Sequence, residues 1–330
     1  MVNRKMTSSE PGRNSPRLLQ VSRRTPEDIR AELLVGLAAP VPSIAPKYLY
    51  DALGSRLFAA ITELPEYYPT RTEAAIFALH RDAIARAVGP APTLVDLGAG
   101  DCSKAARLFA ALDVRRYVAV DISAEFLWQS LSCLQREHPD VEMIGVGLDF
   151  SGTLELPPEA GGGPCLVFYP GSSIGNFSPD EALSFLRSVR QACRGGALLI
   201  GVDLVKPSDL LQAAYDDPLQ VTAAFNRNLL RHVRRLAGAD FELADWRHVA
   251  FFDAARSRVE MHLEAVREVL VSWAGGRRAF GAGERIHTEN SYKWRIEDFA
   301  SLLGRAGFGR LRHWTDERGW YALFAAFAAP

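Results

Sequence analysis

Apolar positions along the chain recur at helical spacing first and group into short, strand-length runs later. The helices expected in the first part of the sequence span residues 26–37, 53–64 and 72–88. The first helix begins after Thr25, which can cap it, and has Pro26 at its first position. Gly89 and Pro90 end the third helix, because neither residue continues a helix readily.

Beyond these helices, short apolar runs alternate with helical segments. The expected strands span residues 93–97, 117–120, 141–148, 165–169 and 197–202. The helices expected between them span residues 103–112, 125–137 and 178–193. A capping box of Ser178 and Glu181 opens the last of these helices. This alternation with short connections predicts an α/β fold in which a parallel sheet carries helices on both faces.

The alternation stops after the fifth strand. Helical segments over 210–215 and 221–236 precede runs that alternate between apolar and polar residues, such as 259–263. Such runs, which include 268–273, are typical of antiparallel strands. A helix over 296–306 and a strand over 320–327 then close the chain. We therefore expect an α+β domain inserted into the sheet domain.

The pattern also predicts where the domains begin and end. The N-terminal segment is polar and basic and contains proline, glycine and serine, which is typical of a disordered tail. The N-terminal helices lie outside the βαβ pattern, so we assign them to the inserted domain. The predicted parts are the tail, the inserted domain and the sheet domain: residues 1–17; residues 18–71 with 206–293; and residues 72–205 with 294–330.

Composition and charge narrow the class of protein. The chain is 48% hydrophobic and 23% charged, as ordinary globular proteins are, and its formal net charge is -1. So small a charge does not attract nucleic acid or an anionic membrane, and we expect a small-molecule substrate with neither of those partners. No apolar stretch has the length of a membrane span or the form of a secretory signal.

The cysteines indicate the cellular compartment. None of the four forms a CxxC pair, and they have no metal-ligand spacing with the seven histidines. They are Cys102, Cys133, Cys165 and Cys193. We therefore expect a reduced, cytoplasmic protein without a metal site.

Three consecutive strand ends carry groups that suit a nucleoside cofactor. Gly98 and Gly100 form a turn after the first strand, Asp121 follows the second, and Asp149 with Phe150 follows the third. In an open parallel sheet these ends meet at one edge, where ligands bind. Asp121 can accept from ribose hydroxyls, and Asp149 can accept from an adenine amine while the phenyl ring lies on the base.

S-adenosylmethionine fits this pattern better than a nicotinamide dinucleotide. The dinucleotide fingerprint has a third glycine where this chain has Ser103, and S-adenosylmethionine has no pyrophosphate to bind. A nicotinamide-dependent oxidoreductase stays open as an alternative. So does the simpler interpretation that Asp121 and Asp149 only cap the helices that follow them.

The segment after the fourth strand, residues 169–177, is expected to touch the methyl acceptor. Asn176 lies within it and carries both a hydrogen-bond donor and an acceptor, which suits the carboxylate and amine of an amino acid. An asparagine in a turn is equally common without any such role.

Several unusual strings along the chain identify a family. They are residues 50–55 (YDALGS), 64–73 (LPEYYPTRTE), 171–176 (GSSIGN), 203–206 (DLVK), 214–217 (AYDD), 221–228 (VTAAFNRN), 260–261 (EM) and 288–291 (TENS). With these strings in order from about residue 25 to the C-terminus, the chain resembles the ergothioneine-pathway histidine Nα-methyltransferases. The resemblance implies a Rossmann-like class I methyltransferase sheet with an inserted α+β substrate-binding domain.

The resemblance also implies roles for particular residues. Asn176 and Tyr215 would hold the substrate carboxylate, and Glu289 and Ser291 would bind the two imidazole nitrogens. Tyr50 would lie near the reacting amine as the candidate catalytic residue. The other implied positions are the pocket residues Tyr67 and Met261 and the cofactor contacts Gly98, Lys104, Asp121, Asp149 and Phe150.

The chain departs from the family pattern in two places. The loop between Gly98 and Lys104 differs from that of the family's members, and so does Asn290, which stands between the two implied imidazole ligands. Neither change removes a contacting side chain, although Asn290 could alter the local packing.

The chemistry of imidazole supports the ring assignment independently. A neutral imidazole is a donor at one nitrogen and an acceptor at the other, so a carboxylate and a hydroxyl complement it. An indole or phenyl ring would leave Glu289 desolvated and unpaired. Outside the family motif, however, Glu289 would be an ordinary surface acid.

The implied reaction is direct displacement of methyl from a sulfonium by a neutral amine. Three transfers would convert L-histidine into its betaine, hercynine, with S-adenosylhomocysteine as the other product, and we expect a monomer. Tyr50 is the candidate for orienting the amine, and its ring and that of Tyr67 could favour the growing cation. Two alternatives stay open: a methyltransferase of the same fold acting on another amino acid or small amine, and a non-catalytic module on this fold.

Overall fold

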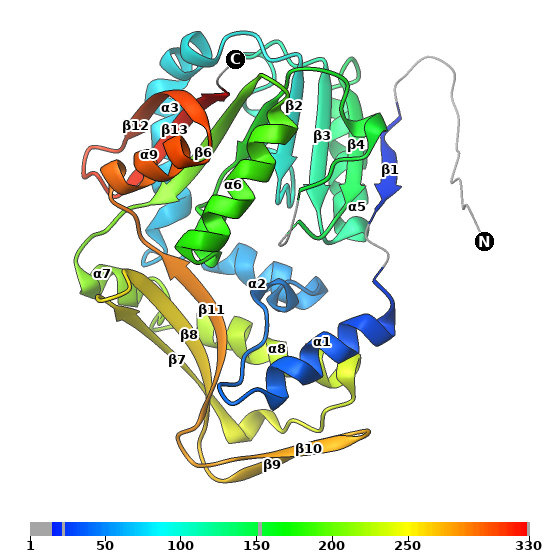
Figure 1. The fold of residues 1–330 in the computed structure, drawn as a ribbon, viewed down its shortest axis with the longest axis vertical. Coiled ribbons are helices and arrows are strands. Elements are labelled where there is room, and N and C mark those ends of the chain that lie inside the picture. The colour runs from blue at the N-terminus through cyan, green and yellow to red at the C-terminus, as the bar shows by residue number, and fades with distance from the viewer. Residues whose placement is uncertain (1–14, 22–23, 151–153, 329–330) are drawn as a thin grey trace.

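The computed structural model describes residues 15–21, 24–150 and 154–328 and contains two main sheets, shown in Figure 1. The larger sheet has the strand order β1-β4-β3-β2-β5-β6-β13-β12. Its strands are β1 (Arg17–Gln20), β2 (Thr93–Leu97), β3 (Arg116–Asp121), β4 (Glu142–Gly147), β5 (Leu166–Tyr169), β6 (Ala197–Asp203), β12 (Phe308–Thr315) and β13 (Tyr321–Ala328). Neighbouring strands are parallel except at β13, which is antiparallel to β6 and β12. The predicted Rossmann-like α/β sheet is confirmed.

Helices cover both faces of the large sheet because its strands are apolar on both sides. One core contains Val95 and Leu97 of β2 and the other contains Leu94, since successive strand residues point to opposite faces. The helices over the first core are α6 (Pro179–Cys193) and α9 (Ile296–Arg305). The helices over the second core are α3 (Tyr68–Val88), α4 (Ser103–Ala106) and α5 (Ala124–Glu137).

A second region lies below the large sheet in Figure 1 and has an apolar core of its own, drawn from residues 33–68 and 211–286. Its antiparallel sheet has the order β11-β8-β7, and β9 and β10 form a separate hairpin. The strands are β7 (Trp246–Asp253), β8 (Arg258–Ala265), β9 (Val269–Trp273), β10 (Gly276–Phe280) and β11 (Arg285–Tyr292). The helices are α1 (Pro26–Ala38), α2 (Ala52–Thr62), α7 (Ser208–Ala213) and α8 (Val221–Ala237). We keep the domain boundaries drawn from the sequence as a proposal.

Four short 3₁₀ turns complete the secondary structure of the described residues. They are η1 (Pro46–Leu49), η2 (Pro158–Ala160), η3 (Ser173–Asn176) and η4 (Leu243–Asp245). The capping box expected at Ser178 is present, and the expected cap Thr25 also forms a capping box, with Asp28. Among the helices of the described residues, none has the length and apolarity needed to cross a membrane.

Two expectations about local structure were wrong. The helix expected over residues 103–112 is helical only as α4, because the backbone then tightens into bonds such as Leu108 N–H to the Ala105 carbonyl, three residues back. Regular structure also begins earlier than Thr25, because β1 pairs in parallel with β4 at the edge of the sheet. Arg17, placed in the disordered tail, instead begins β1 and forms an ion pair with Glu142 at 2.6 Å. The rest of the predicted tail up to residue 14 lies outside the described residues.

Backbone pairings join the two regions at the carboxyl end of β6. Trp294, just after β11, donates its N–H to the carbonyl of Asp203, and the Val205 N–H donates to the carbonyl of Trp294. On the other side of β11, the Ile44 N–H donates to the carbonyl of His287. The end of β6, the strand β11 and the segment before η1 are therefore held together, and the candidate site lies among them.

Candidate active site

The glycine turn after β2 is hydrogen-bonded to Asp121, the last residue of β3. Gly98 and Gly100 have φ angles of 69° and 53°, which glycine adopts without strain. The Gly100 N–H donates to Asp121 Oδ2 at 3.0 Å, and the Ser123 N–H donates to Asp121 Oδ1 at 2.9 Å. A carboxylate has about four acceptor sites. Asp121 therefore keeps acceptor capacity for a pair of ribose hydroxyls.

Phe150 lies over the same turn. A Cβ atom added to Gly98 would be 4.0 Å from Phe150 Cζ, so the ring and the turn are neighbours. Asp149 Oδ2 is 2.9 Å from Lys47 Nζ, and Lys47 in turn pairs with Glu32 at 2.9 Å. The structure thus brings the three predicted strand ends together, and it adds an ion-pair cluster from α1 and η1 that the sequence did not indicate.

Lys104 is held by a buried acid. Its Nζ lies 2.7 Å from Glu73 Oε2, while Glu73 Oε1 accepts from the Gly171 N–H at 2.8 Å and the Tyr321 hydroxyl at 2.7 Å. Glu73 therefore ties Lys104 to the loop after β5, and two of the three ammonium protons remain for a cofactor carboxylate. Sequence reasoning gave Glu73 no role, although its place three residues before the buried Ile76 was a usable signal.

On the substrate side, a bulge in β11 sets which of its residues face the apolar core of the second region. His287 pairs with His262, but Glu289 pairs with Met261, so Thr288 is an extra residue between them. The Thr288 hydroxyl donates to the Met261 carbonyl at 3.0 Å. Glu289 and Ser291 consequently share the face of Met261.

Asn290 lies on the opposite face of the sheet, where it pairs with Glu260. Its Oδ1 is 2.9 Å from His287 Nε2. Asn290, which differs from the pattern of the family that the chain resembles, therefore faces away from Glu289 and Ser291.

Ser291 is the centre of a buried hydrogen-bond cluster. The Tyr215 hydroxyl donates to Ser291 Oγ at 2.7 Å, and Lys293 Nζ donates to Ser291 Oγ at 2.8 Å and to the Tyr215 oxygen at 3.0 Å. Lys293 Nζ also pairs with Asp203 Oδ2 at 2.8 Å. Tyr215, assigned to the substrate carboxylate by the resemblance, uses its hydroxyl proton on Ser291 in this structure.

Asp203 connects this cluster to a second buried lysine. Lys206 Nζ lies 2.5 Å from Asp203 Oδ1, and the Tyr68 hydroxyl donates to Asp203 Oδ2 at 2.7 Å. Burial alone would raise the pKa of Asp203, but the ammonium groups of Lys293 and Lys206 bring it below its usual range. Burial lowers the pKa of Lys206 to about 8. Buried lysines are rare, so the sequence gave no reason to expect either one here.

Glu289 is a buried carboxyl that lacks a complete set of partners. Its residue is 7% exposed, and its Oε2 atom accepts no hydrogen bond from the described residues. Burial raises the pKa of Glu289 to about 7, while the positive charge of Lys293 lowers it. An N–H group from a ligand would satisfy this oxygen.

Aromatic rings surround the space next to Glu289. Tyr67 and Tyr215 meet edge to face with centroids 6.3 Å apart, and Tyr50 meets Phe58 and Phe225 in the same way, each at 5.4 Å. Burial raises the pKa of all three tyrosines well above the usual range, so their hydroxyls stay protonated at neutral pH. Sequence reasoning did not assign Phe58 or Phe225.

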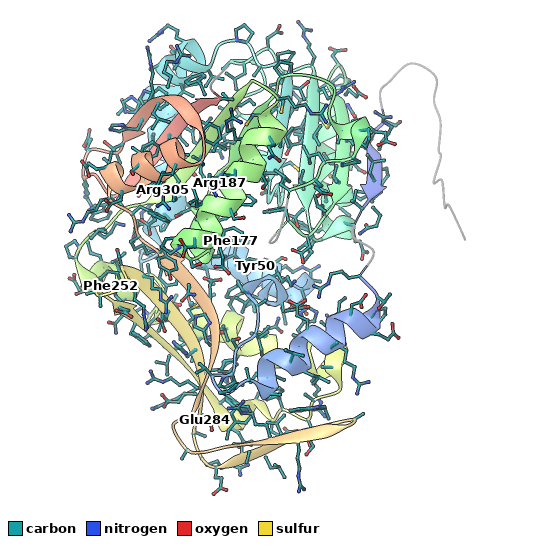
Figure 2. All side chains as sticks on the ribbon, in the orientation of Figure 1. Tyr50, Phe177, Arg187, Phe252, Glu284 and Arg305 are labelled. Atoms are coloured by element: carbon teal, nitrogen blue, oxygen red, sulfur yellow. The ribbon has the colours of Figure 1, made fainter. Side chains whose placement is uncertain are left out.

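Asn176 approaches the site from the large sheet. It ends η3, which packs against β11: a Cβ atom added to Gly175 would lie 3.0 Å from the Tyr292 carbonyl and 3.5 Å from Ser291 Oγ. A side chain at position 175 would crowd this contact, and the close approach brings the neighbouring residue Asn176 to the Ser291 cluster. Figure 2 shows Tyr50 and Phe177 between the large sheet and the second region.

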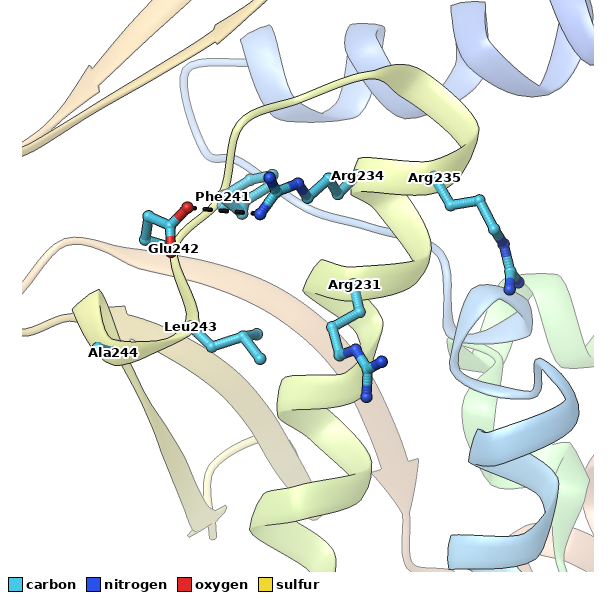
Figure 3. Close-up of a pocket in the computed structure, with 7 residues that line it drawn as sticks. All are labelled: Arg231, Arg234, Arg235, Phe241, Glu242, Leu243 and Ala244. Carbon is cyan, nitrogen blue, oxygen red and sulfur yellow. Dashed lines mark hydrogen bonds and ion pairs between the residues drawn. The ribbon is translucent and has the colours of Figure 1, made fainter.

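Two hollows on the surface lie apart from these residues. The first, of about 400 Å³, is at the C-terminal end of α8, and Figure 3 shows the arginines that line it. Arg234 pairs there with Glu242 at 3.4 Å, and Arg235 pairs with Asp51 at 3.2 Å. The second, of about 640 Å³, lies between α4 and α5. Neither contains a residue of the predicted substrate pocket.

Comparison with known proteins gives consistent matches along most of the chain. A family model described as a histidine-specific, SAM-dependent methyltransferase matches residues 29–328. Histidine N-alpha-methyltransferases from Mycobacterium tuberculosis and Mycolicibacterium smegmatis are 41% and 40% identical, over 90% and 91% of this chain and 94% and 95% of their own. Ergothioneine biosynthesis protein 1 of Neurospora crassa is 29% identical over 83% of this chain and 32% of its own length.

Proposed function

Because this chain belongs to the family of histidine-specific, S-adenosylmethionine-dependent methyltransferases, we propose that it transfers three methyl groups to the α-amino group of L-histidine, giving hercynine for ergothioneine biosynthesis. S-adenosylhomocysteine is the other product. The buried Glu289 carries the choice of substrate, because its Oε2 has no hydrogen-bond donor among the described residues. Glu289 also lies two positions from Ser291 on the same face of the strand.

We assign recognition of the imidazole to Glu289 and Ser291. Alternate residues of a strand stand about 6.6 Å apart on one face, which lets two hydrogen bonds converge on the nitrogens of one small ring. The carboxylate accepts from the N–H, and the hydroxyl serves the other nitrogen. Met261, opposite Glu289 on β8, packs beside the ring and limits its size.

The amino-acid end of the substrate lies toward η3 in this proposal. Asn176 would bind the carboxylate and the amine. Tyr215, the second carboxylate contact that the resemblance implies, would keep its hydroxyl proton on Ser291 and contribute its ring to this end of the pocket. The Tyr50 hydroxyl is protonated, so it would orient the amine through its oxygen and would not act as a phenolate base. The amine must therefore lose its proton to solvent before it reacts.

Successive methylation converts the amine into a quaternary ammonium. The rings of Tyr50 and Tyr67 would stabilise that cation through their π faces, and Phe58 and Phe225, which contact Tyr50, extend the same wall. The aromatic wall thus favours products that carry more methyl groups.

S-adenosylmethionine supplies an electrophilic methyl group on a sulfonium when it is bound. The residues at the strand ends fit it: Asp121 has free acceptor sites for the ribose, and Lys104 has free donors for a carboxylate. Gly98 leaves room for a ligand beneath the Phe150 ring, and Asp149 would accept from the adenine amine beside Lys47. These residues would hold the cofactor at the strand ends, on the side of the site where Asn176 and Tyr50 would bind the amine.

We also propose a cytoplasmic monomer that acts on a small molecule and does not bind nucleic acid. All four cysteines are free, and three of them are buried, which suits a reducing compartment. The net charge of -1 gives no general attraction to polyanions.

The test is mass spectrometry of the purified protein incubated with S-adenosylmethionine and each common amino acid in turn. The proposal expects histidine alone to gain one, two and finally three methyl groups. Modification of a different amino acid would support the alternative of another amine substrate and would remove the Glu289 and Ser291 assignment. Arrest after one methyl group would overturn hercynine as the product.

A further inference from the structure

Lys293 is a fully buried ammonium group directly behind the residues assigned to the imidazole. Its side chain has no solvent exposure, and each of its three protons has an acceptor. The acceptors are Ser291 Oγ at 2.8 Å, the Tyr215 oxygen at 3.0 Å and Asp203 Oδ2 at 2.8 Å. Its orientation is therefore fixed, and it has no proton left for a ligand.

The contacts of Ser291 determine which way its own proton points. A hydroxyl has one proton and two acceptor sites. Both acceptor sites of Ser291 are occupied, one by Lys293 and one by the Tyr215 hydroxyl at 2.7 Å. The serine can therefore form a further hydrogen bond only as a donor.

The charges in this buried cluster also balance. Lys206 and Asp203 form one buried ion pair at 2.5 Å. Lys293 adds a second buried positive charge, and Glu289 is the remaining buried acid that responds to it. The cluster is neutral when Glu289 is a carboxylate, which is the state that accepts a hydrogen bond from a ring N–H.

We propose that Lys293 is a positioning residue that makes the ring site selective for neutral imidazole, with a bare nitrogen facing the Ser291 hydroxyl and an N–H facing the Glu289 carboxylate. This inference rests on the proposed histidine methyltransferase function. Lys293 acts through Ser291 and Glu289 and does not touch the substrate. An imidazolium ring, which has an N–H at both nitrogens, would meet a donor at Ser291 and is rejected.

The first test is steady-state kinetics of Lys293→Met, which keeps the length of the side chain and removes its charge and donors. The KM for histidine is expected to rise roughly tenfold or more, since Ser291 is no longer a fixed donor. The KM for S-adenosylmethionine stays unchanged, because the cofactor residues belong to other elements. The matched control is Lys206→Met, which also removes a buried lysine from Asp203 but does not contact Ser291 or Tyr215. It is expected to lower the melting temperature and leave the KM for histidine within about twofold.

Two further readouts separate positioning from a structural role. In a double-mutant cycle, Lys293→Met adds little to the KM of Ser291→Ala, because both changes remove the same hydrogen bond. The acidic limb of kcat/KM for histidine moves to higher pH in Lys293→Met, because Glu289 loses the charge that favours its ionised form. The other titratable groups facing Glu289 are Tyr50, Tyr67 and Tyr215, and all three stay neutral in this pH range.

Lys293→Gln keeps N–H donors without the charge and serves as the variant if the methionine variant does not fold. It is expected to recover part of the histidine KM and still shift the acidic limb. If the wild-type enzyme methylates histidine, the proposed function stands. In that case additive effects of the Lys293 and Ser291 changes, or an acidic limb that does not shift, would overturn only the role of Lys293. A wild-type enzyme inactive on histidine overturns the proposed function and this inference with it.

Discussion

Ile286 and Glu289 are three positions apart on β11, yet their side chains lie on the same face of the three-stranded sheet. Ile286 pairs with Leu263 and Glu289 pairs with Met261, and the extra residue Thr288 between them accounts for the odd spacing. Before the bulge, Ile286 packs in the apolar core of the second region. After the bulge, the same face of the strand bears the candidate ring ligands.

Replacement of Glu289 by glutamine should remove recognition of the ring N–H while it preserves side-chain shape. We expect kcat/KM for histidine to fall about 10- to 100-fold, because a charged hydrogen bond is lost in a buried site. Steady-state kinetics would measure the fall, with S-adenosylmethionine affinity from calorimetry as the check on folding. Glu268→Gln, an exposed acid immediately before β9, is the control. Equal activity of the two variants would show that Glu289 does not contact the substrate.

The same variant should change the dependence of stability on pH. The pKa of Glu289 is raised from 4.5 to about 7, so the folded protein holds this proton more tightly than the unfolded chain does. In the wild type, the contribution of protonated Glu289 to the free energy of unfolding is therefore complete below pH 4.5. It is lost as the pH rises to about 7.

Urea denaturation without substrate would measure this effect. At pH 8 the free energy of unfolding of Glu289→Gln should exceed that of the wild type by about 3 kcal/mol, and the difference should close near pH 4. A difference that is constant across this range would mean that the pKa of Glu289 is not raised.

Ser291 and Asn290 are adjacent, and their alanine variants should differ sharply. Ser291→Ala is expected to raise the KM for histidine roughly tenfold, because Ser291 shares the face of Glu289. Asn290→Ala should leave that KM within about twofold, since Asn290 contacts His287 on the other face. Parallel kinetics of the two variants tests the bulge itself. The opposite order of effects would require a register in which Asn290 faces the pocket.

Glu73→Gln should weaken cofactor binding without a direct contact to the cofactor. Glu73 anchors Lys104, the Gly171 N–H and the Tyr321 hydroxyl, and the loss of its charge releases Lys104. We expect the Kd for S-adenosylmethionine in calorimetry to rise about tenfold and unfolding free energy to fall by about 1–3 kcal/mol. Asp82→Asn, an exposed acid on the same helix, is the control and should change neither quantity. Unchanged cofactor affinity in a folded Glu73→Gln protein would contradict the role of Glu73.

The sheet strands that carry the cofactor residues could be predicted from the sequence because their signals are local. The run 93–97 is apolar on both sides of the strand, and Ser178 with Glu181 marks a helix start by a specific hydrogen-bond exchange. β1 could not be predicted, because its four residues become a strand only by pairing with β4.

The substrate pocket could be predicted only through the family strings. No local pattern marks β11 as a strand, since its apolar residues Ile286 and Tyr292 are separated by polar ones and the bulge breaks the alternation. Lys293 and Glu73 carry charge into the interior against the usual preference of such side chains for water. Their roles depend on partners far away in the sequence, and only the folded structure brings these together.

The ion pair between Lys293 and Asp203 also bears on how the chain reaches its native register. If the second half of β11 slipped by one residue during folding, Thr288, Asn290 and Tyr292 would face the core and Lys293 would point away from Asp203. The few apolar residues of β11 discriminate weakly between these two registers, whereas a buried lysine without its carboxylate is strongly disfavoured. The charge pair thus favours the one strand register that also assembles the pocket, and it disfavours the register shifted by one residue.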